Sequence, residues 1–208
     1  MLAQKCSVVV RVSGCHGVGK TTLIRGVASC VNGAVLDRLD LAQSPSLSRQ
    51  MRNNLARHLR ESRRERFLLR NRQGPVGLQD RCIYDWIAYL RAYESLGALG
   101  AIEVADLRSH YESAISLMQL PALIVFLDAP SDWIIDKLAR RAAVDPSKPL
   151  DVYTPKLTRA VAPELRRAFL EQAVSLGAKV LHVTTLDHAG RLVEVSSWLH
   201  TQVGEVMR

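Results

Sequence analysis

A stretch near the N-terminus carries the residue types that bind phosphate. Its sequence is Gly14-Cys15-His16-Gly17-Val18-Gly19-Lys20-Thr21, which fits the pattern G-x-x-x-x-G-K-[ST]. Glycines let the backbone curl so that successive N–H groups point inward at phosphate oxygens, and the helix that follows adds the positive end of its dipole. Lys20 would reach the β- and γ-phosphates, and the Thr21 hydroxyl would ligate the Mg²⁺ that bridges them. The pattern predicts a nucleoside triphosphate site made by Gly14, Cys15, His16, Gly17, Val18, Gly19, Lys20, Thr21 and Thr22.

Acidic residues and an arginine follow other predicted strands. Asp37 and Asp40 come where a short second strand would end, and the pair Asp80-Arg81 ends a third. The carboxyl ends of parallel strands gather the ligands of such a sheet. Asp80 is therefore placed to hold Mg²⁺ or to orient the attacking group, and Arg81 indicates an anionic ligand. A structural salt bridge is the alternative for the Asp80 carboxylate.

Strands alternate with helices along the whole chain. The run 8–12 is apolar except for Arg11, and 122–128, which ends in Asp128, is a continuous apolar run up to that residue, of the kind buried on both faces of a parallel sheet. Residues 140–155 are polar and contain prolines, so we expect a loop over the site. The alternation predicts an α/β fold in which helices cover both faces of a parallel sheet. Further strands are predicted at 34–36, 76–80 and 179–184, and helices at 22–29, 45–72 (in two stretches), 83–97, 102–120, 131–139, 157–169 and 192–203.

Length and composition favour one domain. The chain has 208 residues, of which 48% are hydrophobic, so it can bury a substantial core. The N-terminal apolar run is broken by Arg11 and is too short for a signal or membrane segment, which favours a cytoplasmic protein without membrane contact. The four cysteines form no C-x-x-C pair, and the six histidines show no ligand spacing. Apart from Mg²⁺ brought by the nucleotide, no metal is expected.

The positive charge is concentrated in one region. The formal net charge is +8, and nine arginines fall between Arg49 and Arg72, where Glu61 and Glu65 are the acidic residues. Such a charge suits nucleic acid, an anionic membrane surface or polyphosphate ligands. Phe67 is the single aromatic residue of this region, so bases would have little to stack on, and a single-strand-binding protein is disfavoured.

Several motifs follow one another along the chain: the phosphate loop through Thr22, Asp80-Arg81 followed by Ala88-Tyr89, residues 121–130, and Arg140-Arg141. In these motifs and their order the chain resembles the thymidylate kinases and, a little less closely, the deoxynucleoside kinases. The segment 149–153 is similar to the one after the lid in deoxynucleoside kinases. The resemblance implies a P-loop NTPase fold with a five-stranded parallel sheet, a lid at about 140–155, and ATP with Mg²⁺ as donor.

The resemblance also implies roles for single residues. Arg81 would contact the 5′ end or the phosphate of the acceptor, and Asp80 would support Mg²⁺ and the attacking oxygen. Arg140 and Arg141 would close over the transferring phosphoryl group, where fixed positive charge stabilises the transition state. The alternative for these two arginines is a solvated basic helix end, which the helix dipole favours.

The acceptor site departs from the thymidylate kinase pattern. His16 stands where those kinases usually carry an acidic residue, and Asp85 replaces the serine of the motif. Asp37 or Asp40 could match the carboxylate that serves deoxynucleoside kinases as general base toward a 5′-hydroxyl. Guanidinium groups, in contrast, suit an acceptor that already bears phosphate. The candidate acceptor contacts are Asp37, Arg60, Arg63, Arg64, Arg81 and Tyr84.

Taken together, the sequence predicts a single P-loop kinase domain, residues 1–208, that transfers the γ-phosphoryl group of Mg-ATP to a nucleoside 5′-monophosphate or a close analogue. A nucleoside kinase with Asp37 as base is the first alternative. A nucleic-acid-binding P-loop ATPase is an alternative of another class, with nucleic acid as the less favoured partner. A nucleotide switch is disfavoured, since D-x-x-G does not follow the third strand and N-K-x-D is absent. The resemblance also implies a homodimer through the helix 83–96.

Overall fold

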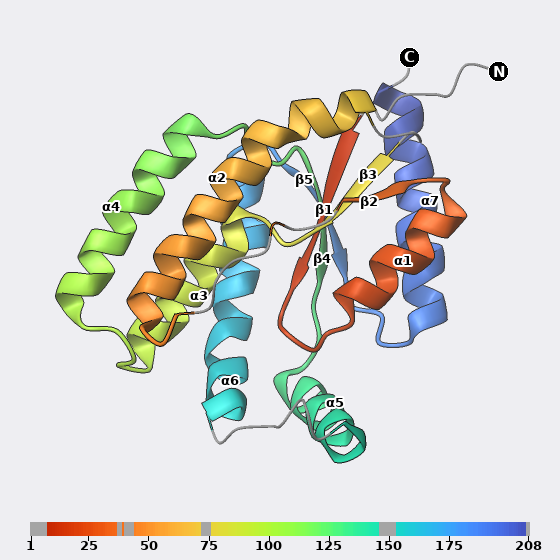
Figure 1. Ribbon diagram of the computed structural model, residues 1–208. Helices are drawn as coiled ribbons and strands as arrows, with labels where there is room; N and C mark the ends of the chain where they lie inside the picture. The colour runs from red at the N-terminus through yellow and green to blue at the C-terminus, as the bar shows by residue number, and fades with distance from the viewer. Residues whose placement is uncertain (1–7, 37–38, 40–43, 72–75, 146–152, 207–208) are drawn as a thin grey trace.

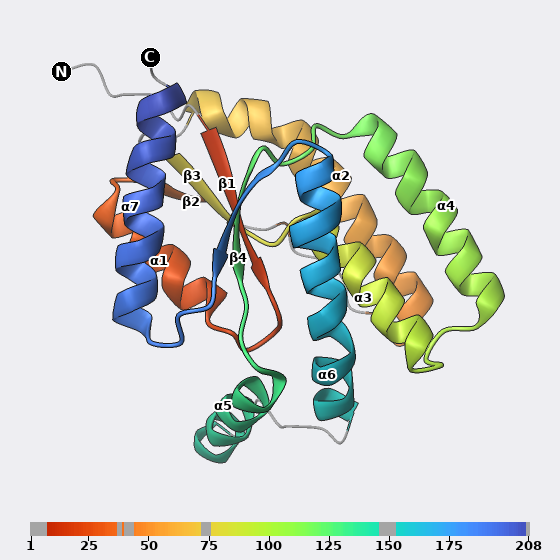
Figure 2. The ribbon, with the colours of Figure 1, turned by 180° about the vertical axis from the view of Figure 1, so that it is seen from behind.

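Helices and strands alternate along the chain and build a five-stranded parallel sheet (Figures 1 and 2). The computed structural model describes residues 8–36, 39, 44–71, 76–145 and 153–206. The strand order across the sheet is β2-β3-β1-β4-β5. The α/β fold that the sequence predicted is thereby confirmed. The strands are β1 (Val8–Gly14), β2 (Ala34–Leu36), β3 (Val76–Asp80), β4 (Leu123–Leu127) and β5 (Lys179–Val183).

The middle strands are buried, and most of the side chains that they contribute to the core are apolar. β4 is buried at every position, and β1 is buried from Val9 to Gly14. In the shared register, Val12 lies opposite Asp80 on β3 and Val125 on β4. Each buried valine or leucine contributes about 1.5–3 kcal/mol, so this apolar centre fixes the strand ends relative to one another. The ends of β1, β3 and β4 consequently meet at one edge of the sheet.

Helices cover both faces of the sheet (Figure 1). On one face lie α1 (Lys20–Cys30) and α7 (His188–Val206), which pack against each other. The helices on the side of the second face are α2 (Leu47–Asn71), α3 (Ile83–Ser95), α4 (Ala101–Leu117) and α6 (Tyr153–Arg166). α4 packs on α2 and α3, and α6 continues as the π-helical segment η1 (Arg167–Ala173). Figure 2 shows the same two groups of helices from behind.

The helix α5 (Ser131–Val144) lies below the carboxyl ends of the strands in Figure 1. Arg140 and Arg141 belong to this helix, so the loop expected over 140–155 begins later than the sequence indicated. The segment 131–144 contains no glycine or proline and is rich in helix-forming residues, which explains its extension. At the far end, Pro155 lies in the first turn of α6, where proline is tolerated. The intervening residues 146–152 lie outside the described residues.

One further helix differs from expectation, and one agrees with it. α2 is one continuous helix of 25 residues, where the sequence indicated two stretches. α3 is enclosed by the chain itself, since eight of its 13 residues are buried and it packs against α2, α4 and α6. The homodimer expected through residues 83–96 stays a prediction.

Within the described ranges, no helix combines the length and the apolar character needed to cross a membrane. The same residues contain no group of three or more His, Cys, Asp or Glu side chains that could hold a metal ion.

Candidate functional site

The phosphate loop connects β1 to α1 at the carboxyl edge of the sheet. Gly14 has a φ of 139°, and a Cβ atom there would lie 2.4 Å from the carbonyl oxygen of Leu127. Gly17 has a φ of 77°, and a Cβ atom there would lie 2.6 Å from Cδ2 of Leu138 in α5. Both positions require glycine, since any other side chain would clash and strain the backbone. The loop is thus held between β4 and α5.

Lys20 is enclosed by the loop. Its side chain is buried, and its ammonium donates hydrogen bonds to the carbonyl oxygens of Gly14 (3.0 Å) and Cys15 (2.8 Å). Burial, and after it the charge of Arg81, lowers the pKa of Lys20 to about 8, although the Asp80 carboxylate opposes the shift. The lysine can exchange its two carbonyl partners for phosphate oxygens when an anion enters the loop.

A pocket of about 390 Å³ opens beside the loop. Both arginines are exposed, but Arg141 of α5 lines the pocket and its neighbour Arg140 does not. Adjacent residues on a helix do not share a face, so the structure brings only one of the two expected arginines to the phosphate loop. The full lining is Gly17, Gly19, Lys20, Thr21, Thr22, Lys137, Leu138 and Arg141.

Two oxygen-bearing side chains in this region fit a magnesium ion. The Oδ1 atom of Asp80 is buried and has no hydrogen-bond partner among the described residues. Thr21 is exposed and lines the pocket beside Lys20. Mg²⁺ prefers oxygen ligands and usually keeps several waters, so a carboxylate, a hydroxyl and phosphate oxygens suit it. The residues present therefore fit the metal that accompanies a nucleoside triphosphate.

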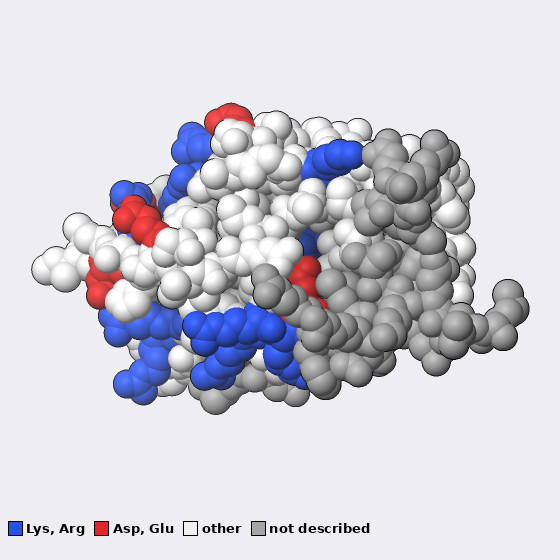
Figure 3. All heavy atoms as spheres, turned by 90° about the horizontal axis from the view of Figure 1, so that it is seen from above, with Lys and Arg blue, Asp and Glu red and all other residues white. Residues whose placement is uncertain are grey.

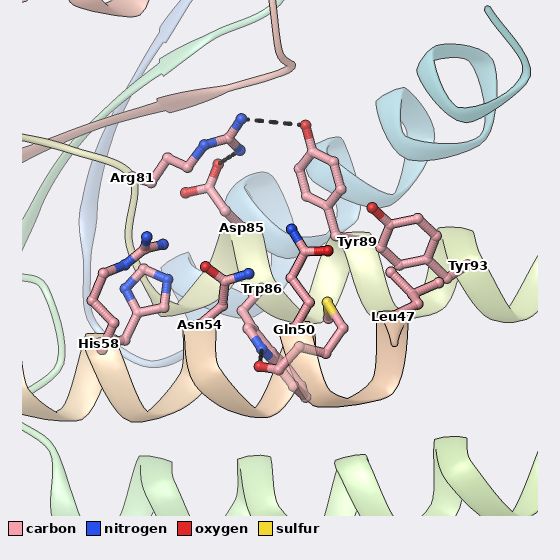
Figure 4. Close-up of a pocket in the computed structure, with 11 residues that line it drawn as sticks. Leu47, Gln50, Asn54, His58, Arg81, Asp85, Trp86, Tyr89 and Tyr93 are labelled. Carbon is pink, nitrogen blue, oxygen red and sulfur yellow. Dashed lines mark hydrogen bonds and ion pairs between the residues drawn. The ribbon is translucent and has the colours of Figure 1, made fainter. Parts of the chain in front are cut away.

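Arg81 is held in an unusual backbone conformation. Its φ of 66° lies in the left-handed region, and its N–H donates to the carbonyl oxygen of Val12 (2.9 Å). Its guanidinium donates to the Asp85 carboxylate (3.3 Å) and to the Tyr89 hydroxyl (3.4 Å), as Figure 4 shows. Burial by itself would lower the pKa of Arg81, but Tyr89, Asp85 and Asp80 raise it, so the guanidinium stays charged. Strained backbone of this kind clusters at functional sites.

Asp85 joins three parts of the site. Its buried carboxylate accepts hydrogen bonds from the Ser13 hydroxyl (2.7 Å) and from the backbone N–H of Cys82 (2.9 Å). Cys82 is the N-cap of α3 and Asp85 its third residue, so the carboxylate also caps the helix. The aspartate that replaces the serine of the kinase motif therefore ties β1 and α3 to Arg81.

A second cavity, of about 230 Å³, lies between α2 and α3 (Figure 4). α2 presents two amide side chains, Gln50 and Asn54, and α3 presents aromatic rings. The indole N–H of Trp86 donates to the carbonyl oxygen of Met51 (2.7 Å), which fixes that ring against α2. Flat apolar rings opposite amide groups suit a planar heterocycle with hydrogen-bonding edges. The lining is Leu47, Gln50, Met51, Asn54, Arg57, His58, Arg81, Asp85, Trp86, Tyr89 and Tyr93.

His16 connects the phosphate loop to both α3 and α6. Its backbone N–H donates to the Tyr89 hydroxyl (3.2 Å), and its Nδ1 lies 3.1 Å from the same hydroxyl. Its Nε2 lies 2.8 Å from Oγ1 of Thr158, which itself donates to the carbonyl oxygen of Thr154 (2.8 Å). Because that hydroxyl proton is engaged, the bonding pattern assigns the ring proton to Nε2, and Nδ1 accepts from Tyr89. His16 is thus part of the framework between the two pockets.

Three arginines predicted for the acceptor site lie elsewhere. Arg60, Arg63 and Arg64 are exposed, and none of them lines the cavity. Arg57 and His58, earlier on the same helix, take that place. Their place along the helix decides this, because the part of α2 that lines the cavity ends at His58 and the three arginines come later.

Tyr84 lies away from both pockets, and the residues expected as general base lie outside the described residues. Tyr84 is fully buried in the core, with its ring edge-on to Phe169 at 6.1 Å between centroids, and it lines neither pocket. Asp37 and Asp40 lie outside the described residues, so their place near the acceptor stays a prediction.

Sequence reasoning missed several residues that the structure brings to the site, among them Gln50, Asn54 and Trp86. A signal for two of them exists, since Gln50, Asn54 and Arg57 recur at i, i+4 and i+7 and share one helix face. Lys137 gave no such signal, because its role depends on where α5 lies relative to the loop.

A glycine-rich loop that leaves the first strand of a parallel sheet and enters a helix holding its lysine defines the P-loop class of nucleotide-binding folds. Superposition on solved structures identifies proteins that share this fold. The deoxyadenosine kinase from M. mycoides with bound dATP superposes with a TM-score of 0.73 at 11% sequence identity, over 93% of this chain and 100% of that chain. Its structure with the products dCMP and a flexible dCDP bound gives 0.73 at 12% identity over the same shares. The thymidylate kinase from Candida albicans gives 0.63 at 15% identity, over 99% of this chain and 94% of that chain.

No protein-family model matches the sequence, and no curated protein matches it. The similarity of this chain to the solved kinase structures is therefore a similarity of fold. The chain has the fold of the deoxynucleoside and thymidylate kinases, as the resemblance of its motifs predicted.

Proposed function

We propose that this protein is an ATP-dependent kinase that transfers the γ-phosphoryl group of Mg-ATP to a nucleoside 5′-monophosphate or a close analogue. The observation that carries the proposal is the pair of pockets at the carboxyl edge of the sheet. One contains the phosphate loop with Lys20 and Arg141, and the other contains the amides and rings of α2 and α3. Arg81 and Tyr89 line the second pocket and are linked through His16 to the first. A phosphoryl donor and a nucleoside-like acceptor would thus meet beside Arg81.

In the proposed reaction an oxygen of the acceptor attacks the γ-phosphorus, the bond to the β–γ bridging oxygen breaks, and ADP leaves with that oxygen. Magnesium, when bound, neutralises charge on the phosphates. The loop N–H groups orient the donor, while Lys20 and Arg141 add positive charge where negative charge moves. Arg81, oriented by Asp85 and Tyr89, would hold the 5′ end of the acceptor in line. Positioning and electrostatics supply the rate.

The charge at the cavity favours an acceptor that carries phosphate. Two guanidinium groups, Arg57 and Arg81, line it together with His58, against the single carboxylate of Asp85 among the lining residues. Guanidinium groups pair with phosphate two oxygens at a time. A nucleoside monophosphate is therefore the first candidate.

A nucleoside with a free 5′-hydroxyl is the second candidate, because both guanidinium groups already face carboxylates. Arg57 Nε lies 3.7 Å from Glu61 and Arg81 lies 3.3 Å from Asp85. This pairing reduces the positive charge available to a phosphate. The fold shared with a deoxyadenosine kinase supports the same candidate, and Asp37 would then act as general base.

The two candidate acceptors are distinguished by measuring ADP release from Mg-ATP with a panel of nucleosides and their monophosphates. The masses of the products are measured as well. Conversion of a monophosphate to a diphosphate would support the first candidate. With a nucleoside acceptor, Asp37→Asn is expected to lower kcat at least about 100-fold. With a monophosphate acceptor, which needs no strong base, the same variant should retain most activity. A panel in which nothing is phosphorylated would contradict the proposal.

A further inference from the structure

Three side chains gather beside the phosphate loop at Gly19. Trp133 and Lys137 come from α5, and Arg191 comes from α7. The Lys137 ammonium lies 4.6 Å from the centre of the Trp133 ring, and the guanidinium carbon of Arg191 lies 5.5 Å from it. A Cβ atom at Gly19 would lie 3.4 Å from the Lys137 ammonium and 3.6 Å from Nη1 of Arg191. Two cations therefore stack on one ring next to the loop.

Arg191 donates a hydrogen bond directly to the phosphate loop. The residue is 3% exposed, and its Nη1 donates to the carbonyl oxygen of Val18 (2.6 Å). Its Nε donates to the carbonyl oxygen of Thr185, just before α7. The remaining nitrogen, Nη2, is buried and has no hydrogen-bond partner in the part of the chain that the structure describes. Buried polar atoms are nearly always paired, so this nitrogen marks a place for a further acceptor group.

Lys137 and Arg191 lie together although both are cations. Burial, and after it the charge of Arg191, lowers the pKa of Lys137. Burial also lowers the pKa of Arg191, against the opposing effect of Asp187 and Glu194. Lys137 lines the pocket of the phosphate loop. Like charges this close repel, and an anion in that pocket would be attracted to both and offset the repulsion.

Arg191 influences the phosphate loop through the orientation of the peptide between Val18 and Gly19. In a trans peptide the C=O and N–H groups point in opposite directions. Because the Val18 carbonyl points at Arg191, the N–H of Gly19 points away from it. Gly19 is the N-cap of α1, and N–H groups at this end of a helix are the ones that bind phosphate.

We propose that Lys137 binds a phosphate oxygen of the triphosphate donor and that Arg191 is a positioning residue, which holds the Val18–Gly19 peptide in its phosphate-binding orientation. The proposal shares with the proposed function only the triphosphate donor. Lys137 rests on Trp133 in the free protein and moves from the ring to the phosphate when the donor binds. The fluorescence of Trp133 should therefore report donor binding.

The test uses the full chain with three separate probes: inorganic tripolyphosphate, MgATP and adenosine. Lys137→Gln is expected to weaken the binding of tripolyphosphate and MgATP about tenfold, measured by calorimetry, with the affinity for adenosine unchanged. Arg25→Gln is the matched control, because it removes one positive charge from an exposed position on α1. It should keep all three affinities within about twofold of the wild type.

Arg191→Lys tests the positioning role without emptying a buried site. The lysine keeps the charge but loses the planar pair of donors, so tripolyphosphate binding should weaken while adenosine binding does not. A merely structural role would lower the melting temperature and leave the ratio of the two affinities unchanged. Tripolyphosphate should change the tryptophan emission of the wild type, and Trp133→Phe should abolish that change. An unchanged wild-type emission would overturn the movement of Lys137.

If Lys137→Gln and Arg191→Lys bind tripolyphosphate as tightly as the wild type, the inference is overturned. It is also overturned if the wild type binds no tripolyphosphate at all. The proposed function fails separately, when no acceptor is phosphorylated although tripolyphosphate binding persists and depends on Lys137.

Discussion

Lys20 is a buried cation and Arg81 a half-buried one, and their surroundings shift their pKa values in opposite directions. Burial lowers the pKa of Lys20 to about 8, whereas the neighbours of Arg81 raise its pKa. The difference follows from chemistry, since an ammonium loses its proton readily when desolvated and a guanidinium does not. Near neutral and alkaline pH, donor binding should therefore depend on the protonation of Lys20.

The affinity for MgATP is expected to fall as the pH rises above about 8, the pKa of Lys20 in the free protein. Phosphate favours the charged lysine, so the pKa rises on binding and a proton is taken up between the two values. Below about 8 the lysine is already charged and the affinity should be flat, while above it the logarithm of the affinity should fall by up to about one per pH unit.

Calorimetry between about pH 7 and about pH 9.5, in buffers of different ionisation enthalpy, measures both the affinity and the proton uptake. Lys20→Arg keeps its charge over this range and should remove the slope. A slope that persists in this variant would assign the titration to another group.

At the residue scale, the phosphate loop could be predicted because its chemistry lies in adjacent residues. The acceptor cavity could not, because its lining comes from two helices and depends on where along their length these helices face each other. Arg57 and Arg60 look alike in the sequence, yet Arg57 lines the cavity and Arg60 is exposed, beyond the last residue of α2 that lines it. Tyr84 was misplaced for a similar reason, since it follows Arg81 closely in sequence but points into the core.

At the scale of elements, the position of α5 depends on the phosphate loop that it covers. Leu138 packs where a side chain at position 17 would lie, so the glycine sets how close α5 can come. The same helix carries Lys137 and Arg141 to the pocket. The position of α5 therefore couples packing at Leu138 to charge at the phosphates.

Gly17→Ala is expected to lower the free energy of unfolding by about 1–3 kcal/mol and to weaken MgATP binding, because the new methyl group pushes Leu138 and α5 away. The second substitution Leu138→Ala removes the clashing atom, so the double variant should lose less stability than the sum of the two single variants. Recovery should be partial, since alanine stays strained at a φ of 77°. Denaturant unfolding of the four proteins measures the coupling, and strict additivity would contradict the contact.

The cavity between α2 and α3 makes a separate prediction about acceptor selection. Asn54→Ala is expected to raise the KM of the acceptor about tenfold by removing a hydrogen bond to its base, with the KM of ATP unchanged. Asn53→Ala is the matched control, because Asn53 is adjacent on the helix and does not line the cavity. Equal effects of the two variants would contradict a role of this cavity in binding the acceptor.

At the scale of the whole molecule, the charge is unevenly placed. Figure 3 shows Lys and Arg side chains gathered on one part of the face seen from above. The net charge is +8, and α2 contributes the exposed side chains of Arg60, Arg63 and Arg64. These arginines are solvated, and exposed charges separated by more than about 8 Å are largely screened at physiological salt. They should act on large polyanions rather than on the nucleotide site.

The triple variant Arg60→Gln/Arg63→Gln/Arg64→Gln is therefore expected to keep the KM values of ATP and acceptor within about twofold of the wild type. Arg57→Gln, which removes one charge from the cavity lining, should raise the KM of the acceptor and serves as the comparison.

Binding of the wild type to duplex DNA should be weak and should fall steeply with salt. The slope of the logarithm of the binding constant against the logarithm of the salt concentration should be reduced by up to about 2.7 in the triple variant. Tight DNA binding at physiological salt that the triple variant abolishes would instead favour a nucleic-acid-dependent ATPase. A triple variant that lost acceptor binding alone would return these three arginines to the acceptor site, where the sequence first suggested them.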